Sequence, residues 1–187
     1  MIRNTKQTNT KENILYNNIL LLSRNKVLFT KFNLTDSFQN RIILLFIHIS
    51  FLFIKLNENS GIKRYKVIYQ RLFDFLFKQI ELNMREIGYG DVQVNKNMKL
   101  LVKSFYNILL YCEDYKKKQS ESKKAFFAKY LLLNISKKTP NNNHIIEYFD
   151  KFQTFCFDLN SDSVLKGKLN FKYNEIYKNG STEAKDI

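Results

Sequence analysis

Two long segments with apolar residues at three- and four-residue steps constrain the fold more than any other feature of this sequence. In the first segment these residues are Tyr65, Ile68, Leu72, Phe75, Leu76, Ile80, Met84 and Ile87. In the second they are Met98, Leu101, Val102, Phe105, Ile108, Leu109, Cys112 and Tyr115. This spacing places apolar side chains on one face of a helix. The sequence therefore predicts two consecutive amphipathic helices.

The segment between the two helices, Ile87-Gly88-Tyr89-Gly90-Asp91, predicts a sharp corner. Its first glycine directly follows the apolar pattern, where glycine can close a helix in the left-handed conformation without steric cost. The second glycine is another permissive position before the chain turns. We expect Asn95 to cap the second helix, and Val92 and Val94 to anchor the corner in the core.

Residues 37–56 are the most apolar part of the chain. A bilayer span needs about 20 consecutive apolar residues, whereas this run has about 13, contains His48 and is bounded by Arg41 and Lys55. A segment that is apolar almost all round and too short to cross a bilayer predicts a buried central helix. A histidine on such a helix is most often hydrogen-bonded within the core, and a role as ligand or switch is the alternative.

Shorter apolar patterns predict further helices near residues 14–22, 126–133 and 145–159. We interpret Lys26–Leu34 as an extended connection held to the core by Val27, Phe29 and Phe32. The cluster at 57–61 and the proline-containing segment 137–143 predict breaks. The lysine clusters at 116–118 and 123–124 fit either a solvated helix or a loop.

The predicted fold is all-α, a single compact helical domain of about five to seven helices around a central apolar helix. We expect residues 1–12 to be disordered, 13–168 to form the helical domain, and 169–187 to form a loose tail. Within this tail, Phe171, Tyr173 and Tyr177 are the residues that could dock.

A formal net charge of +14 predicts attraction to phosphate-rich partners such as ribosomal RNA or an anionic membrane face. Codon bias toward A and T is the alternative source of this charge, because lysine, asparagine, isoleucine and phenylalanine are all over-used.

Cys112 and Cys156 are predicted to be reduced core residues. With two cysteines and two histidines in the chain, the sequence favours neither a disulfide framework nor a metal site. Residues 1–13 lack the apolar segment of a secretory signal.

The corner carries charged residues but no recognisable catalytic constellation. It lacks the lysine and hydroxyl of a phosphate-binding loop. Glu81 and Glu86 are five residues apart, so they do not share a helix face as a pair of catalytic carboxylates would. The macrodipole disfavours Glu86 near a helix end unless Arg85, Lys96 or a partner compensates its charge. Arg85 is suited either to a partner's carboxylate or to holding Asp91 in place. This local conflict marks the corner as a candidate binding site.

The corner and its surroundings resemble the ubiquinol-cytochrome c chaperone family. The residues that carry the resemblance are Asn83-Met84-Arg85-Glu86-Ile87-Gly88-Tyr89-Gly90-Asp91, Asn97-Met98-Lys99, Ser104-Phe105-Tyr106, and the upstream Asp36-Ser37-Phe38-Gln39-Asn40-Arg41, Leu45–His48 and Leu72–Phe77 segments. The match covers about residues 29–115. The family is all-helical, has no known catalytic activity, and includes mitochondrial factors that escort newly made cytochrome b into respiratory complex III.

The resemblance implies a non-enzymatic assembly chaperone for ubiquinol-cytochrome c reductase, with no cofactor and with cytochrome b or another complex III subunit as partner. It also implies possible contacts with the ribosome exit region, an anionic membrane surface and a small helper protein, without specific DNA binding. In a bacterium the protein would be cytoplasmic and peripheral to the inner membrane, and in a eukaryote it would lie on the mitochondrial matrix side.

An escort for apolar helices must offer an apolar patch of its own, and 17 phenylalanines and 11 tyrosines supply the material. Tyr65, Tyr69, Tyr89 and Tyr106 are candidate surface anchors. The predicted partner-binding residues are Arg85, Glu86, Tyr89, Asp91, Lys96 and Tyr106. The alternative function is a small basic ribosome- or RNA-associated protein without a membrane-protein client. This alternative is supported by the positive charge alone, since the sequence lacks the known RNA-reading signatures.

Overall fold

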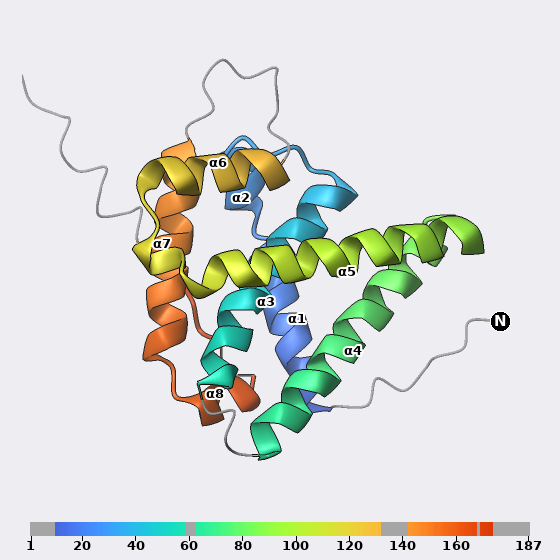
Figure 1. Ribbon diagram of the computed structural model, residues 1–187, viewed down its shortest axis with the longest axis horizontal. Helices are drawn as coiled ribbons and strands as arrows, with labels where there is room; N and C mark the ends of the chain where they lie inside the picture. The colour runs from blue at the N-terminus through green and yellow to red at the C-terminus, as the bar shows by residue number, and fades with distance from the viewer. Residues whose placement is uncertain (1–9, 59–62, 132–141, 168, 174–187) are drawn as a thin grey trace, which may run out of the picture.

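The computed structural model describes residues 10–58, 63–131, 142–167 and 169–173, and within them the fold is all-α (Figure 1). Its elements are α1 (Lys11–Ser23), α2 (Lys26–Thr30), α3 (Phe38–Asn57), α4 (Lys63–Glu86), α5 (Asp91–Glu113), the 3-10 turn η1 (Tyr115–Lys117), α6 (Ser120–Tyr130), α7 (Asn142–Asp158) and α8 (Ser161–Leu165). Apart from the five-residue α2 and α8, six α-helices have eleven residues or more. The predicted fold class is confirmed.

Helix α3 is the central element, as predicted. Its N-cap residue is Ser37, whose hydroxyl accepts a hydrogen bond from the Asn40 backbone N–H at 3.2 Å. By length and composition it is the one helix among the described residues that could cross a membrane, but 78% of its most apolar window is buried inside the protein. Helices α1, α4, α5 and α7 pack around it. Its apolar side chains therefore form the core of the domain.

Helices α4 and α5 pack on α3 and on each other, and they meet at a corner at one edge of the molecule (Figure 1). The aromatic ring of Phe105 on α5 joins the three helices. Its centroid lies 5.2 Å from that of Phe46 and 5.8 Å from that of Phe53, both on α3, and 5.7 Å from that of Phe77 on α4. Edge-to-face contacts of this kind stabilise a core beyond the area that they bury. Leu72, Leu76, Ile80 and Met84 on α4 and Ile108, Leu109 and Cys112 on α5 are also buried. Both amphipathic patterns are therefore confirmed, except at Ile87, which is 56% exposed at the corner.

Residues 26–34 differ from the predicted extended connection, because they begin with the short helix α2. The Asn25 side chain accepts a hydrogen bond from the Val27 backbone N–H at 3.0 Å and starts the helical turn. Phe32 is buried as expected, whereas Val27 and Phe29 are only partly buried. The N-cap residue thus starts a helix in a segment whose apolar pattern is too short to predict one.

The start of the predicted loose tail packs against α7. The ring centroids of Phe171 and Tyr173 lie 5.6 Å and 4.6 Å from that of Tyr148. Residues 169–173 therefore belong with the helical domain, because their aromatic side chains extend its core. The predictions for residues 1–9, for the proline-containing break up to residue 141 and for Tyr177 lie outside the described residues.

The second lysine cluster is only partly solvated. Lys123 on α6 is almost fully buried, with its Nζ 2.6 Å from Asp150 Oδ1 on α7 and 4.3 Å from the ring centroid of Tyr115. This ion pair joins α6 to α7, and it compensates the Lys123 charge, which would destabilise the folded protein if it were buried without a partner.

Cys112 and Cys156 are buried free thiols, as predicted, and burial raises the pKa of both.

Candidate functional site

The α4–α5 corner is closed by hydrogen bonds around Gly88. The Tyr89 N–H donates to the Met84 carbonyl at 3.0 Å, and the Gly88 N–H donates to the Arg85 carbonyl at 3.1 Å. This pair of bonds is a Schellman motif, which requires a left-handed residue, and Gly88 has φ +96°. The expected helix-closing glycine is therefore confirmed.

The start of α5 corrects two predictions about the corner. The helix begins at Asp91 with Gly90 as its N-cap residue, so Asn95 lies inside the helix and does not cap it. Val94 is fully buried, but Val92 is 84% exposed. Residues two apart in a helix point to nearly opposite sides, so an earlier helix start leaves only one of the two valines in the core.

Arg85 ties the corner together on its surface. Its guanidinium donates to Glu81 Oε1 at 2.9 Å and 3.1 Å, from Nη2 and Nε, and its Nη1 also donates to Asp91 Oδ1. The last turn of α4 is thus joined to the first turn of α5, which is one of the two roles predicted for Arg85. Among the described residues, no cation lies within ion-pair distance of Glu86 at the same helix end.

The six predicted partner-binding residues fall into two groups. Arg85, Glu86, Tyr89 and Asp91 are all exposed at the corner. Lys96 and Tyr106 lie farther along α5, ten residues apart, which corresponds to about 15 Å. The Tyr106 ring is 47% exposed and packs 5.8 Å from Phe73 on α4. The corner is therefore one compact site, and Tyr106 lies apart from it.

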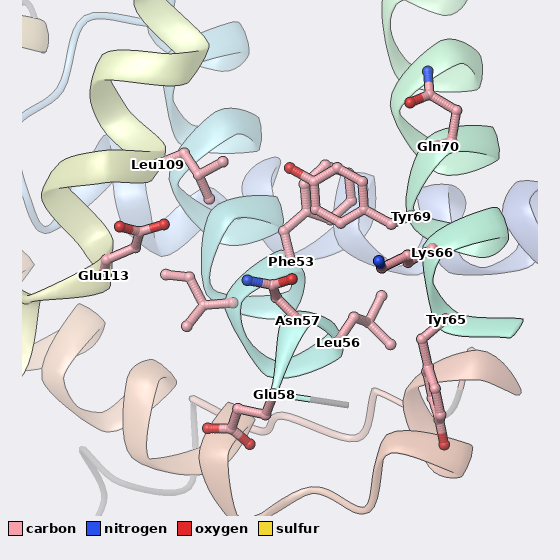
Figure 2. A pocket seen from close by; sticks show the side chains of 11 residues that line it. Phe53, Leu56, Asn57, Glu58, Tyr65, Lys66, Tyr69, Gln70, Leu109 and Glu113 are labelled. Atoms are coloured by element: carbon pink, nitrogen blue, oxygen red, sulfur yellow. The ribbon is translucent and has the colours of Figure 1, made fainter. Parts of the chain in front are cut away.

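A hollow of about 500 Å³ lies between the end of α3, the first turns of α4 and the last turns of α5 (Figure 2). Its lining residues are Phe53, Ile54, Leu56, Asn57, Glu58, Tyr65, Lys66, Tyr69, Gln70, Leu109 and Glu113. The lining thus combines aromatic and aliphatic side chains with polar and charged ones. A hollow of this size and composition is typical of a site that binds a ligand or a partner's side chain.

Two tyrosines that the sequence suggests as surface anchors line this hollow. The Tyr69 ring lies 4.1 Å from the Phe53 ring, centroid to centroid. Burial, followed by the neighbouring Tyr106 and Glu113, raises the pKa of Tyr69 to about 12, so its hydroxyl stays protonated and can donate. Tyr65 is buried and donates to Asp162 Oδ1 at 3.2 Å, so it is a wall residue, not a surface anchor.

The sequence gives only a weak signal for the hollow, because its residues come from three segments that are far apart in the chain. Periodicity predicts which face each helix buries, but not how far the helix ends splay from one another. The described residues contain no group of three histidine, cysteine, aspartate or glutamate side chains that could hold a metal ion.

A family model for the ubiquinol-cytochrome C chaperone matches residues 30–171, well over half of the 187-residue chain. The protein belongs to this family. The match extends beyond the segments that carry the resemblance in the sequence, and it includes α6, α7 and the docked residues up to Phe171. Both the corner and the hollow lie within the part of the chain that the ubiquinol-cytochrome c chaperone family shares.

A comparison with solved structures finds the crystal structure of the Cbp3 homolog from Brucella abortus, with a TM-score of 0.73. The two sequences are 18% identical, and the similarity covers 88% of this chain and 90% of that one. At this identity the likeness establishes the shared fold. No curated protein matches the sequence. Membership of the ubiquinol-cytochrome c chaperone family therefore rests on the family model.

Proposed function

We propose that this protein is a non-enzymatic assembly chaperone of respiratory complex III that escorts newly made cytochrome b. The observation that carries the proposal is the family match over residues 30–171. The proposed chaperone acts by binding, so it needs a surface that accepts apolar side chains without exposing a large apolar patch to water. In the bacterial case it would be cytoplasmic and peripheral to the inner membrane, and in the eukaryotic case on the matrix side.

The hollow between α3, α4 and α5 is the client site that the geometry supports best. Cytochrome b is a bundle of apolar helices, and its side chains need a partly enclosed apolar surface before the bundle is complete. Phe53, Leu109 and the Tyr69 ring offer such a surface within the hollow (Figure 2). Burying one large apolar side chain there would contribute about 1.5–3 kcal/mol to binding. Lys66 and Glu113 at the rim would orient the polar ends of the client segment.

The other partners remain predictions from the resemblance. These are the ribosome exit region, an anionic membrane surface and a small helper protein. The corner residues Arg85, Glu86, Tyr89 and Asp91 are the candidates to contact the ribosome or the helper protein. Glu86 is the most informative of the four, because it lies at the unfavourable end of the α4 macrodipole and has no cation nearby among the described residues. A basic partner group would relieve this conflict.

A substitution that fills the mouth of the hollow tests the client site. Gln70 is exposed beside the hollow, and within the described part of the chain its side chain bonds only to Asp74 on the same helix, at 2.8 Å. Gln70→Trp should therefore block the hollow without removing a core contact. We expect the tagged variant to recover several-fold less cytochrome b from native membranes than the unchanged protein does.

Lys78→Trp is the matched control, because Lys78 is exposed on the same helix but does not line the hollow. It should recover cytochrome b at the unchanged level, and circular dichroism should show equal helicity for both variants. Equal recovery of cytochrome b by the two folded variants would show that the client does not use the hollow.

A further inference from the structure

Helix α5 presents three aliphatic side chains to solvent along its outer face. Val92 is 84% exposed, Leu100 57% and Leu110 62%. Single exposed aliphatic residues are common on protein surfaces, but these three follow one another on the side of the helix opposite to the buried Val94 and Phe105. From Val92 to Leu110 the outer face extends about 27 Å.

Three lysines occupy the same face between the aliphatic residues. Lys96, Lys99 and Lys103 are all exposed, and among the described residues no carboxylate lies within ion-pair distance of any of them. No aspartate or glutamate occurs between Asp91 and Glu113. Val92, Lys96, Lys99 and Leu100, together with Asn95, also line a shallow depression on this face. The outer face of α5 therefore combines three lysines between residues 96 and 103 with exposed aliphatic side chains from Val92 to Leu110.

We propose that the outer face of α5 lies on an anionic phospholipid bilayer. A helix in this position places its apolar side chains among the upper acyl chains and its cationic heads at the phosphates. Lysine suits this arrangement, because its long apolar stem can lie along the interface while the ammonium group reaches the headgroups. Helix α5 is already fixed in the fold by its inner face, so no part of the helix needs to be ordered on binding.

Exposed aliphatic residues favour a bilayer over a nucleic acid as the occupant of this face. A single-stranded nucleic acid is bound through aromatic rings that stack on bases and through cations at the phosphates. Val92, Leu100 and Leu110 cannot stack, but each of them gains from leaving water for the acyl region. The inference deepens the proposed function and rests on it, because a chaperone peripheral to the membrane needs a surface that contacts the bilayer, and the outer face of α5 supplies that surface.

Vesicle sedimentation with the purified full-length protein tests this inference. We expect sedimentation with vesicles of phosphatidylcholine and phosphatidylglycerol, and at least tenfold weaker sedimentation with phosphatidylcholine alone. The triple variant Lys96→Gln, Lys99→Gln, Lys103→Gln should bind the anionic vesicles at least tenfold more weakly. The control variant Lys26→Gln, Lys78→Gln, Lys116→Gln loses the same charge from exposed positions outside α5. Its binding to the anionic vesicles should weaken less than threefold.

The aliphatic contribution is tested separately with Leu100→Gln, Leu110→Gln, which keeps the charge and the helix propensity of α5. At high salt, where screening has removed most of the electrostatic attraction, this variant should bind anionic vesicles severalfold more weakly than the unchanged protein does. Equal loss in the two triple-lysine variants would overturn the proposal, because net charge alone would then explain binding. Failure of the unchanged protein to sediment with anionic vesicles would overturn it too, whether or not the same lysines bind a ribosomal RNA fragment. Neither result bears on cytochrome b recovery.

Discussion

At the scale of single residues, His48 is the most constrained polar group of the core. It is fully buried, its Nδ1 lies 2.7 Å from the Leu44 carbonyl oxygen, and its Nε2 lies 2.7 Å from the Tyr148 hydroxyl. Because a carbonyl oxygen only accepts, Nδ1 carries the proton, and Nε2 accepts from Tyr148. The prediction of a hydrogen-bonded core histidine is confirmed. The sequence alone predicts these hydrogen bonds, because a histidine surrounded by apolar residues must find its partners within the fold.

The buried imidazole predicts a dependence of stability on acid. Burial lowers the pKa of His48 from 6.5 to about 4, although the bond to Leu44 opposes the shift. Between these values the unfolded chain binds a proton that the folded protein excludes. The free energy of unfolding should therefore fall as the pH drops from about 6.5 toward 4, by roughly 3 kcal/mol for this group.

Denaturant unfolding at several pH values, compared between the unchanged protein and His48→Gln, isolates this contribution. Glutamine keeps polar atoms at the site but does not titrate. The variant should be less stable at pH 7 and should lose less stability on acidification. Parallel pH profiles for the two proteins would mean that His48 is not excluded from protonation in the folded state.

Arg85 shows how far sequence reasoning extends at this scale. Its position in the last turn of α4, three residues before Gly88, predicts a tie to Asp91, and the structure contains that ion pair together with a second one to Glu81. The pairs are exposed, so they are compatible with exchange for a partner's carboxylate. Whether Arg85 contacts a partner remains a prediction.

At the scale of helices and corners, the long periodic patterns predicted α4, α5 and α7 because each of these helices buries one face over three or more turns, whereas α3 was predicted from a run that is apolar almost all round. The start of α5 was misjudged for a physical reason. Asn95 is a good capping residue, but the backbone at Gly90 already has the extended conformation of an N-cap, with φ −72° and ψ 162°. The short α2 and α8 have too few turns to show a pattern, and a single capping side chain decides each of them.

The two glycines of the corner provide a matched pair of substitutions. A Cβ atom added at Gly88 or Gly90 would meet no atom within 4 Å, so steric crowding does not distinguish the two positions. The backbone does, because Gly88 has φ +96° and Gly90 has φ −72°. Gly88→Val should therefore cost more than about 1 kcal/mol of stability, and Gly90→Val clearly less.

Thermal unfolding of the two valine variants measures this difference. For a domain of this size, 1 kcal/mol corresponds to about 2–4 °C in melting temperature. Equal melting temperatures for the two variants would show that the left-handed conformation at Gly88 is not required to close α4.

At the scale of the whole molecule, the aromatic-rich composition is mostly accounted for by the core, because all 17 phenylalanines are buried in it or packed against it. Phe46, Phe53, Phe77 and Phe105 form one network across three helices. The hollow beside this network could not be predicted, since its shape depends on how the ends of α3, α4 and α5 diverge. The basic charge had no predicted location. In the structure, part of it lies on the outer face of α5, where aliphatic residues accompany it.

The central claim, a chaperone of complex III assembly, is tested most directly in a host that makes complex III and whose own copy of this gene is deleted. The assembled complex is measured on native gels, together with cytochrome b protein and its messenger. We predict that assembled complex III and cytochrome b both fall while the messenger is unchanged, and that the unchanged gene and Lys78→Trp restore both where Gln70→Trp does not. Normal levels of assembled complex III in the deletion strain would contradict the account.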